Sequence, residues 1–157
     1  MRTAAAACVT ACALAGVASA AVPVLPGRAG SVSSSSTRAG ATPIALTFRL
    51  QYEMQCGSPG RGPVTIVLPA PVTAPGKIAR AAVLLDGKAP ESVSVSGSRI
   101  VIGIPPRTGV MCDVIGPGTL TVVLEKQAGI GNPKSAGSYV FRVSVGSESF
   151  GPTLTVR

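Results

Sequence analysis

The sequence predicts an all-β protein built from antiparallel sheets, and three observations lead to that prediction. Apolar and polar residues alternate along several short stretches, as in strands that have one face buried and one face in water. Val, Ile and Leu must build the core, because the chain has no Trp, two Tyr and three Phe, and β-branched side chains favour pleated sheets. The 19 Gly and 14 Pro separate the alternating stretches, as expected of strands joined by tight turns.

The alternation locates the individual strands. It is longest from Ile44 to Cys56, where seven apolar residues share one face, and this stretch is long enough to be divided in two by a bulge. Asp86-Gly87 and Gly97-Ser98 are hairpin signals. The other predicted strands lie at 64–68, 83–85, 93–95, 100–104, 120–124, 139–145 and 154–156. Seven to eight strands with turn signals about every 8–12 residues predict an immunoglobulin-like antiparallel β-sandwich. A small β-barrel is the alternative.

The first 20 residues have the three parts of a secretory signal peptide. Met1-Arg2-Thr3 is a basic start, 4–17 is an apolar run, and Ala18-Ser19-Ala20 is a small-x-small cleavage site. The run is shorter than the roughly 20 apolar residues that span a bilayer, so a retained anchor is the weaker interpretation, as is lipid modification of Cys12. We therefore expect a secreted, extracellular protein without a membrane span, with cell-wall association as a further option.

The remaining chain divides into two parts. Residues 21–43 are rich in Ser, Gly and Pro, and they bury too little apolar area to offset the entropy cost of ordering them. This segment is predicted to be a disordered leader. The sandwich domain is predicted at 44–157, where the alternation begins.

The cysteines predict one disulfide. Cys8 and Cys12 lie in the signal peptide, which leaves Cys56 and Cys112, and a pair of cysteines in an exported protein is expected to oxidise. Met54 and Met111 lie beside them, and a sulfur-ligated Cu(I) site is the alternative. Met54 belongs to the apolar face of its strand, where Met ordinarily fills gaps in a core. The disulfide is the favoured interpretation, and no cofactor or metal is predicted.

No catalytic site is predicted. The chain has no His, which excludes Ser-His-Asp and Cys-His arrangements and the usual zinc sites. Its six acidic residues show no pairing of the kind that a glycosidase needs across a cleft. No phosphate-binding Gly loop precedes a helix. We therefore expect a protein that is not an enzyme.

The charge is strongly positive, with 14 Lys or Arg against 6 Asp or Glu and a net charge of +8. Such a balance favours anionic partners, here an anionic cell-wall polymer or an envelope protein. Nucleic acid is not expected, because no motif combines aromatic and basic side chains. The alternative is a dispersed, solvated charge that only keeps the protein soluble. Five basic residues on or beside the predicted strands form the candidate anionic-ligand face: Arg49, Arg80, Arg99, Lys126 and Arg142.

Two stretches carry a resemblance to a known class of module. One joins Val83-Leu84-Leu85-Asp86-Gly87 to the strands at 93–102, and the other runs Gly129-Ile130-Gly131-Asn132-Pro133 and then Ala136-Gly137-Ser138-Tyr139. Together they resemble the bacterial extracellular immunoglobulin-like modules found in surface-layer-associated and adhesin-like proteins. The resemblance covers about residues 78–148 and implies an immunoglobulin-like fold in a cell-envelope or extracellular setting, but no ligand or reaction. Tyr139 either fills the core or makes a tyrosine-corner hydrogen bond.

These observations lead to three hypotheses about function. The first is a secreted, non-catalytic immunoglobulin-like module that binds a component of the cell envelope or extracellular matrix. The second is a structural or assembly module that pairs through a sheet edge. A Met/Cys copper carrier is a distant third.

Overall fold

The structure, a computed structural model, describes residues 29–52, 62–105 and 118–157. Its strands are β1 (Gly30–Ser34), β2 (Leu46–Leu50), β3 (Val64–Val67), β4 (Val83–Leu85), β5 (Ser92–Ser96), β6 (Arg99–Gly103), β7 (Leu120–Leu124), β8 (Gly137–Val140), β9 (Arg142–Val145), β10 (Glu148–Phe150) and β11 (Thr153–Val156). The helical elements of the described residues are two short 3-10 turns, η1 (Arg80–Ala82) and η2 (Lys126–Ala128).

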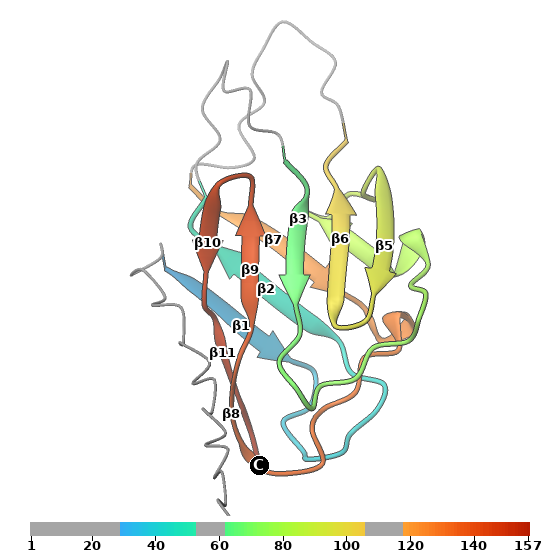
Figure 1. The fold of residues 1–157 in the computed structure, drawn as a ribbon, viewed down its shortest axis with the longest axis vertical. Helices are drawn as coiled ribbons and strands as arrows, with labels where there is room; N and C mark the ends of the chain where they lie inside the picture. The colour runs from blue at the N-terminus through green and yellow to red at the C-terminus, as the bar shows by residue number, and fades with distance from the viewer. Residues whose placement is uncertain (1–28, 53–61, 106–117) are drawn as a thin grey trace, which may run out of the picture.

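The strands form two sheets packed face to face, so the protein is an all-β sandwich. One sheet has the order β1-β2-β7-β4 and the other β10-β9-β3-β6-β5, while β8 and β11 form a separate two-stranded ladder. Every ladder is antiparallel. The strands of the four-stranded sheet run obliquely behind the five-stranded sheet (Figure 1). Both sheets are open, so the described residues form a sandwich rather than the alternative barrel.

The strand order is that of an immunoglobulin variable-type sandwich except at one point. In that type, a four-stranded sheet packs against a five-stranded one. The hairpin at the edge of the larger sheet comes earlier in the chain than the strand at the edge of the smaller sheet. Here β4 completes the four-stranded sheet first, and the β5–β6 hairpin follows it in the chain. The neighbour of β3 is consequently β6, the second strand of the hairpin.

The predicted leader at 21–43 is corrected by the structure, because β1 lies inside it. All five residues of β1 pair with β2, from Gly30 opposite Leu50 to Ser34 opposite Leu46. Val32 packs against the core, whereas Ser31 and Ser33 are exposed. Burial within the segment itself is small, as the sequence suggested, but the backbone hydrogen bonds to a neighbouring strand order it. The domain therefore begins before residue 44.

Strand number and boundaries also differ from the prediction. The described residues form eleven short strands instead of seven to eight, because no strand was predicted at β1 or β10 and the strand predicted at 139–145 is divided. Within the stretch predicted from Ile44 to Cys56, β2 ends at Leu50, where the Tyr52 amide turns back to donate to the Leu50 carbonyl oxygen at 2.9 Å. Residues 53–56 of that stretch lie outside the described residues. The predicted strand at 139–145 is divided at Phe141 into β8 and β9. The chain that returns after β9 is likewise divided, into β10, which pairs with β9, and β11, which pairs with β8. The β8–β11 ladder thus bends away from the five-stranded sheet toward β1.

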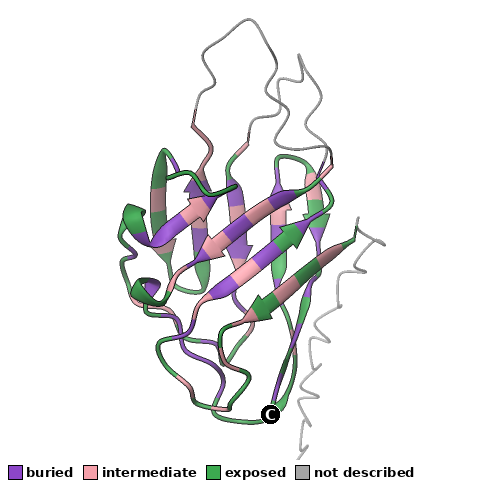
Figure 2. Ribbon diagram, turned by 180° about the vertical axis from the view of Figure 1, so that it is seen from behind, coloured by how far each residue is buried: buried purple, intermediate pink, exposed green. Residues whose placement is uncertain are grey.

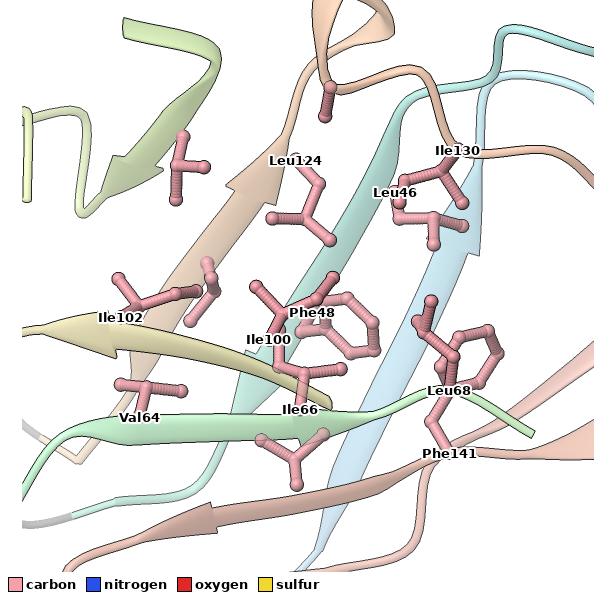
Figure 3. Close-up of a cluster of buried hydrophobic side chains, with 14 of the residues drawn as sticks. Leu46, Phe48, Val64, Ile66, Leu68, Ile100, Ile102, Leu124, Ile130 and Phe141 are labelled. Carbon is pink, nitrogen blue, oxygen red and sulfur yellow. The ribbon is translucent and has the colours of Figure 1, made fainter. Parts of the chain in front are cut away.

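The core lies between the sheets and consists of the inward face of each alternating strand. Val64, Ile66, Ile100 and Ile102 of the five-stranded sheet face the side chains of the four-stranded sheet (Figure 3). The rings of Phe48 on β2 and of Phe141, between β8 and β9, meet edge to face within it, with centroids 5.4 Å apart and an interplanar angle of 72°. Both rings have no exposed surface, so the aromatic pair links the two layers.

The Asp86-Gly87 turn is confirmed, but its role differs from the expected one. Asp86 and Gly87 have φ angles of 47° and 76°, the positive values that a type I′ turn requires at both central positions. Leu85 and Lys88 exchange hydrogen bonds of 2.8 and 2.9 Å across the turn. The Asp86 carboxylate also accepts from the Thr121 amide at 2.8 Å. The ladder partner of β4 is β7 rather than the next strand along the chain.

Asn132 and Tyr139 of the Gly129–Tyr139 motif each bind the backbone of another segment or turn. The Asn132 side-chain amide donates to the carbonyl oxygens of Ser36 at 2.8 Å and Arg38 at 2.9 Å. Its backbone amide donates to Ala41 at 2.9 Å. The Tyr139 hydroxyl donates to the Ser135 carbonyl oxygen at 2.9 Å, a bond back to the chain four residues upstream, as in a tyrosine corner.

We expect Asn132→Ala to lower the free energy of unfolding by about 1–3 kcal/mol, because two hydrogen bonds worth about 0.5–1.5 kcal/mol each are lost. The Ser36 carbonyl oxygen then keeps only the Ser34 hydroxyl as a donor, and that of Arg38 only the Ala41 amide. Asn132 is 6% exposed, so water cannot readily replace the lost bonds. Chemical denaturation monitored by circular dichroism measures the change. Lys134→Ala is the control, since Lys134 is exposed nearby and should change stability by less than about 0.5 kcal/mol. Equal stability of the two variants would contradict the structural role of Asn132.

Candidate functional site

The outer face of the five-stranded sheet is the best candidate site in the described residues. Its inward residues, such as Ile66, Ile100 and Val143, belong to the core, and their sequence neighbours therefore point to the opposite side of the sheet. The residues so placed carry mostly small or hydroxyl side chains. They are Thr65 and Val67 of β3, Ser92, Ser94 and Ser96 of β5, Arg99, Val101 and Gly103 of β6, Arg142 and Ser144 of β9, and Ser149 of β10.

Two arginines lie in one row across this face. Arg99 of β6 and Arg142 of β9 both pair with Val67 of the central strand β3. Two strand spacings therefore separate their Cα atoms, a distance of about 10 Å. Both arginines are exposed, whereas Val67 between them is half-buried. The two guanidinium groups can thus reach successive groups of one ligand that lies across the sheet.

A row of hydroxyl groups runs beside the arginines. The register places Ser149 opposite Ser144, Ser144 opposite Thr65, Thr65 opposite Val101, and Val101 opposite Ser94. Four of the five residues in this row carry a hydroxyl that can both donate and accept hydrogen bonds. Sequence reasoning missed these residues, although alternating Ser or Thr within the strands was a usable signal.

The face carries no acidic side chain at any of its outward strand positions. Glu148 is the one acidic residue in the five strands of this sheet. It pairs with Val145, whose side chain is fully buried, so Glu148 points to the inner side. The charge of Arg99 and Arg142 is therefore not offset by a carboxylate within the face itself.

The structure does not bring the five predicted basic residues onto one face. Arg49 is exposed on β2, between Ser31 and Thr121 of its neighbouring strands, on the outer face of the four-stranded sheet. That sheet forms the opposite side of the sandwich, and buried residues alternate with intermediate or exposed ones along β2, β4 and β7 (Figure 2). Arg49 cannot act together with Arg99 and Arg142, because the whole sandwich lies between them.

Arg80 and Lys126 belong to neither sheet. They begin the two 3-10 turns, which contact each other. The Glu125 amide, just before Lys126, donates to the Ala82 carbonyl oxygen at 2.9 Å. Both basic residues are exposed. The structure thus places Arg99 and Arg142 on one face and the other three basic residues elsewhere, and a role for any of them in binding an anionic ligand stays a prediction.

The sulfur-containing candidates lie outside the described residues, and the disulfide stays a prediction. These are Cys56 and Cys112, together with Met54 and Met111 of the copper alternative. Within 29–52, 62–105 and 118–157, no three Asp, Glu or Cys side chains gather where they could hold a metal ion. No helix in these ranges has the length and apolar composition needed to cross a membrane.

Comparison with known proteins does not assign the chain to a family. No family model matches it, and no curated protein matches it. Among solved structures, the fold is similar to the crystal structure of BslA, described as a bacterial hydrophobin, with a TM-score of 0.47. The two sequences are 19% identical, and the match covers 82% of this chain and 94% of that chain. A likeness of this degree assigns neither a family nor a function.

Proposed function

We propose that this protein is a secreted, non-catalytic binding module that holds an anionic polymer of the cell envelope or extracellular matrix. The binding surface is the outer face of the five-stranded sheet. The observation that carries the proposal is the row in which Arg99 and Arg142 flank Val67, on a face without a carboxylate at its outward strand positions.

The shape of the face suits an extended polymer. The row from Ser149 to Ser94 crosses all five strands, and its side chains are small. Small side chains on a sheet leave a broad surface rather than a deep pocket. Guanidinium groups bind carboxylate or phosphate oxygens through paired hydrogen bonds. The neighbouring hydroxyls can bind the sugar or ester oxygens between the charged groups.

The rest of the chain agrees with such a ligand and with the proposed compartment. Without residues 1–20, which contain Arg2 and no acidic residue, the chain has 13 Lys or Arg against 6 Asp or Glu, and a net charge of +7 attracts polyanions over longer range than the contact itself. The signal-peptide pattern of residues 1–20 and the resemblance to bacterial extracellular modules support an extracellular setting. Tyr139 adds to that resemblance, since its hydroxyl bond to Ser135 is of the tyrosine-corner kind.

The proposal is tested by reversing charge on this face and, with the same total change, elsewhere. We expect Arg99→Glu/Arg142→Glu to raise the dissociation constant for a polyanion by about tenfold or more, through loss of two attractions and gain of two repulsions. Arg49→Glu/Arg80→Glu is the matched control, with equal net charge and both substitutions off the face. Calorimetry with polygalacturonate and with a glycerol-phosphate teichoic acid distinguishes a carboxylate ligand from a phosphate ligand, and dextran is the neutral comparison.

Salt provides a second criterion. Exposed charge contacts are screened over about 8–10 Å at physiological ionic strength, so binding should weaken as salt rises from low to physiological concentration. Equal losses in the two double variants would show that only net charge matters. Binding to neither polyanion, or equal binding to dextran, would overturn the proposal.

A further inference from the structure

We propose that two copies of this protein pair through strand β5, antiparallel and centred on Ser94, so that their five-stranded sheets join into one. β5 is the last strand of its sheet and has one ladder partner, β6. No backbone hydrogen bond from the rest of the described chain reaches its other edge. The partner that this edge fits is a second β5, and the inference does not rest on the proposed ligand.

The pairing pattern identifies which backbone groups face outward. The Leu68 amide donates to the Ser98 carbonyl oxygen at 2.9 Å, so Ser98, and by alternation Ile100 and Ile102, direct their backbone groups toward β3. Arg99, Val101 and Gly103 must then direct theirs toward β5, where they pair with Ser96, Ser94 and Ser92. The backbone N–H and C=O groups of Val93 and Val95 are left facing the open edge.

The sequence of β5 is symmetric about Ser94. It reads Ser-Val-Ser-Val-Ser from Ser92 to Ser96, which is the same in both directions. In an antiparallel pair with a two-fold axis at Ser94, each Val93 lies opposite Val95 of the second copy, and the two Ser94 residues lie opposite each other. This register brings together the residues whose backbone groups face the edge, so each Val93–Val95 pair exchanges two hydrogen bonds.

The side chains are also matched across this interface. Val93 and Val95 pack against the core on the inner side but remain only half-buried. Across the two-fold axis, Val93 of one copy would contact Val95 of the second copy, and this contact would cover apolar surface at the sheet edge. The serines of the two copies meet on the outer side. The contact is therefore isologous, the type found in most symmetric dimers.

β5 also lacks the features that usually prevent edge pairing. Sheet edges are commonly protected by charged residues, by proline or by very short strands, and none of these occurs within Ser92–Ser96. The other sheet ends differ. β4 and β10 have three residues each, and β1 packs against β11. The open edge of β5 is thus the longest unprotected one in the described residues.

The test places a charge at the two-fold axis. Ser94 is exposed, so Ser94→Lys should leave the fold intact while setting two lysines directly opposite each other. Like charges in such a pair are destabilising, and we expect the association constant to fall by about tenfold or more. Ser149→Lys is the matched control, because Ser149 is exposed in the same outward row at the far edge of the sheet and adds the same charge. Sedimentation equilibrium over a concentration series measures association of the purified protein.

A charge exchange makes the test specific for self-pairing. Ser94→Glu alone should also dissociate the dimer, whereas an equimolar mixture of Ser94→Lys and Ser94→Glu should restore it as a heterodimer. Hydrogen exchange should show the Val93 and Val95 amides protected in the dimer and not in the Ser94→Lys monomer. A wild-type protein that stays monomeric at millimolar concentration overturns the inference, and so does a dimer that survives Ser94→Lys. A monomer that still binds the polyanion would overturn this inference alone and leave the proposed function standing.

Discussion

Phe48→Ala is expected to lower the free energy of unfolding by about 3–5 kcal/mol, the usual cost of removing a buried aromatic side chain. The Phe48 ring is fully buried and meets Phe141 edge to face at 5.4 Å. It extends from β2 of one sheet toward the centre of the sandwich, so its loss opens a cavity between both layers. Native domains are typically stable by about 5–15 kcal/mol, so this single change is expected to remove a large part of the stability.

Chemical denaturation followed by circular dichroism measures the loss. Phe48→Leu is expected to cost less, because it refills part of the volume. Val140→Ala is the surface control, since Val140 is 51% exposed and its truncation should change stability by about 0.5 kcal/mol or less. A Phe48→Ala variant as stable as Val140→Ala would mean that the two sheets do not depend on this aromatic contact.

Cys56→Ser is expected to destabilise the oxidised protein by about 4 kcal/mol, because the unfolded chain regains the entropy that the cross-link removes by closing a long loop. For a domain of this size, such a loss lowers the melting temperature by about 10 °C or more. The cysteines lie outside the described residues, but the residues flanking them support the pairing. One cysteine-containing segment connects β2 to β3 and the other connects β6 to β7. Leu50 at the end of β2 lies opposite Leu120 at the start of β7, and Val64 at the start of β3 lies opposite Ile102 of β6.

Differential scanning calorimetry under oxidising conditions measures this shift. Cys112→Ser and the double variant should lose the same amount as Cys56→Ser, because each removes the same bond. Full reduction of the wild-type protein should produce the same melting temperature as the variants. Two reactive thiols in the native oxidised protein, or an unchanged melting temperature for Cys56→Ser, would contradict the disulfide and reopen the copper alternative.

The candidate site shows how far local patterns can reach. That Arg99 and Arg142 point outward follows from the alternation of their strands, since Ile100 and Val143 beside them are apolar. That they lie in one row does not follow, because each pairs with Val67, which is 32 residues before Arg99 and 75 before Arg142. Arg49 satisfies the same local pattern but belongs to the other sheet. Alternation predicts which side chains of a strand point outward, but it does not predict which strands share a sheet.

Local sequence patterns were enough to predict the fold class, the core residues on the predicted strands, and the turns at Asp86-Gly87 and Gly97-Ser98, whereas Ile78, Ile130 and Phe150 join the core from outside those strands. These properties depend on neighbours a few residues apart: the period-two burial around Phe48, the Asp86-Gly87 turn and the symmetric sequence of β5. Three features depend on contacts between distant segments and could not be predicted locally: Gly30–Ser34 is a strand, β4 joins β7, and two of the five basic residues share a face. The physical reason is that a strand receives its backbone hydrogen bonds from a partner distant in the chain. A segment with little apolar content of its own can therefore be ordered by that partner, and the choice of partner also decides which outward side chains become neighbours.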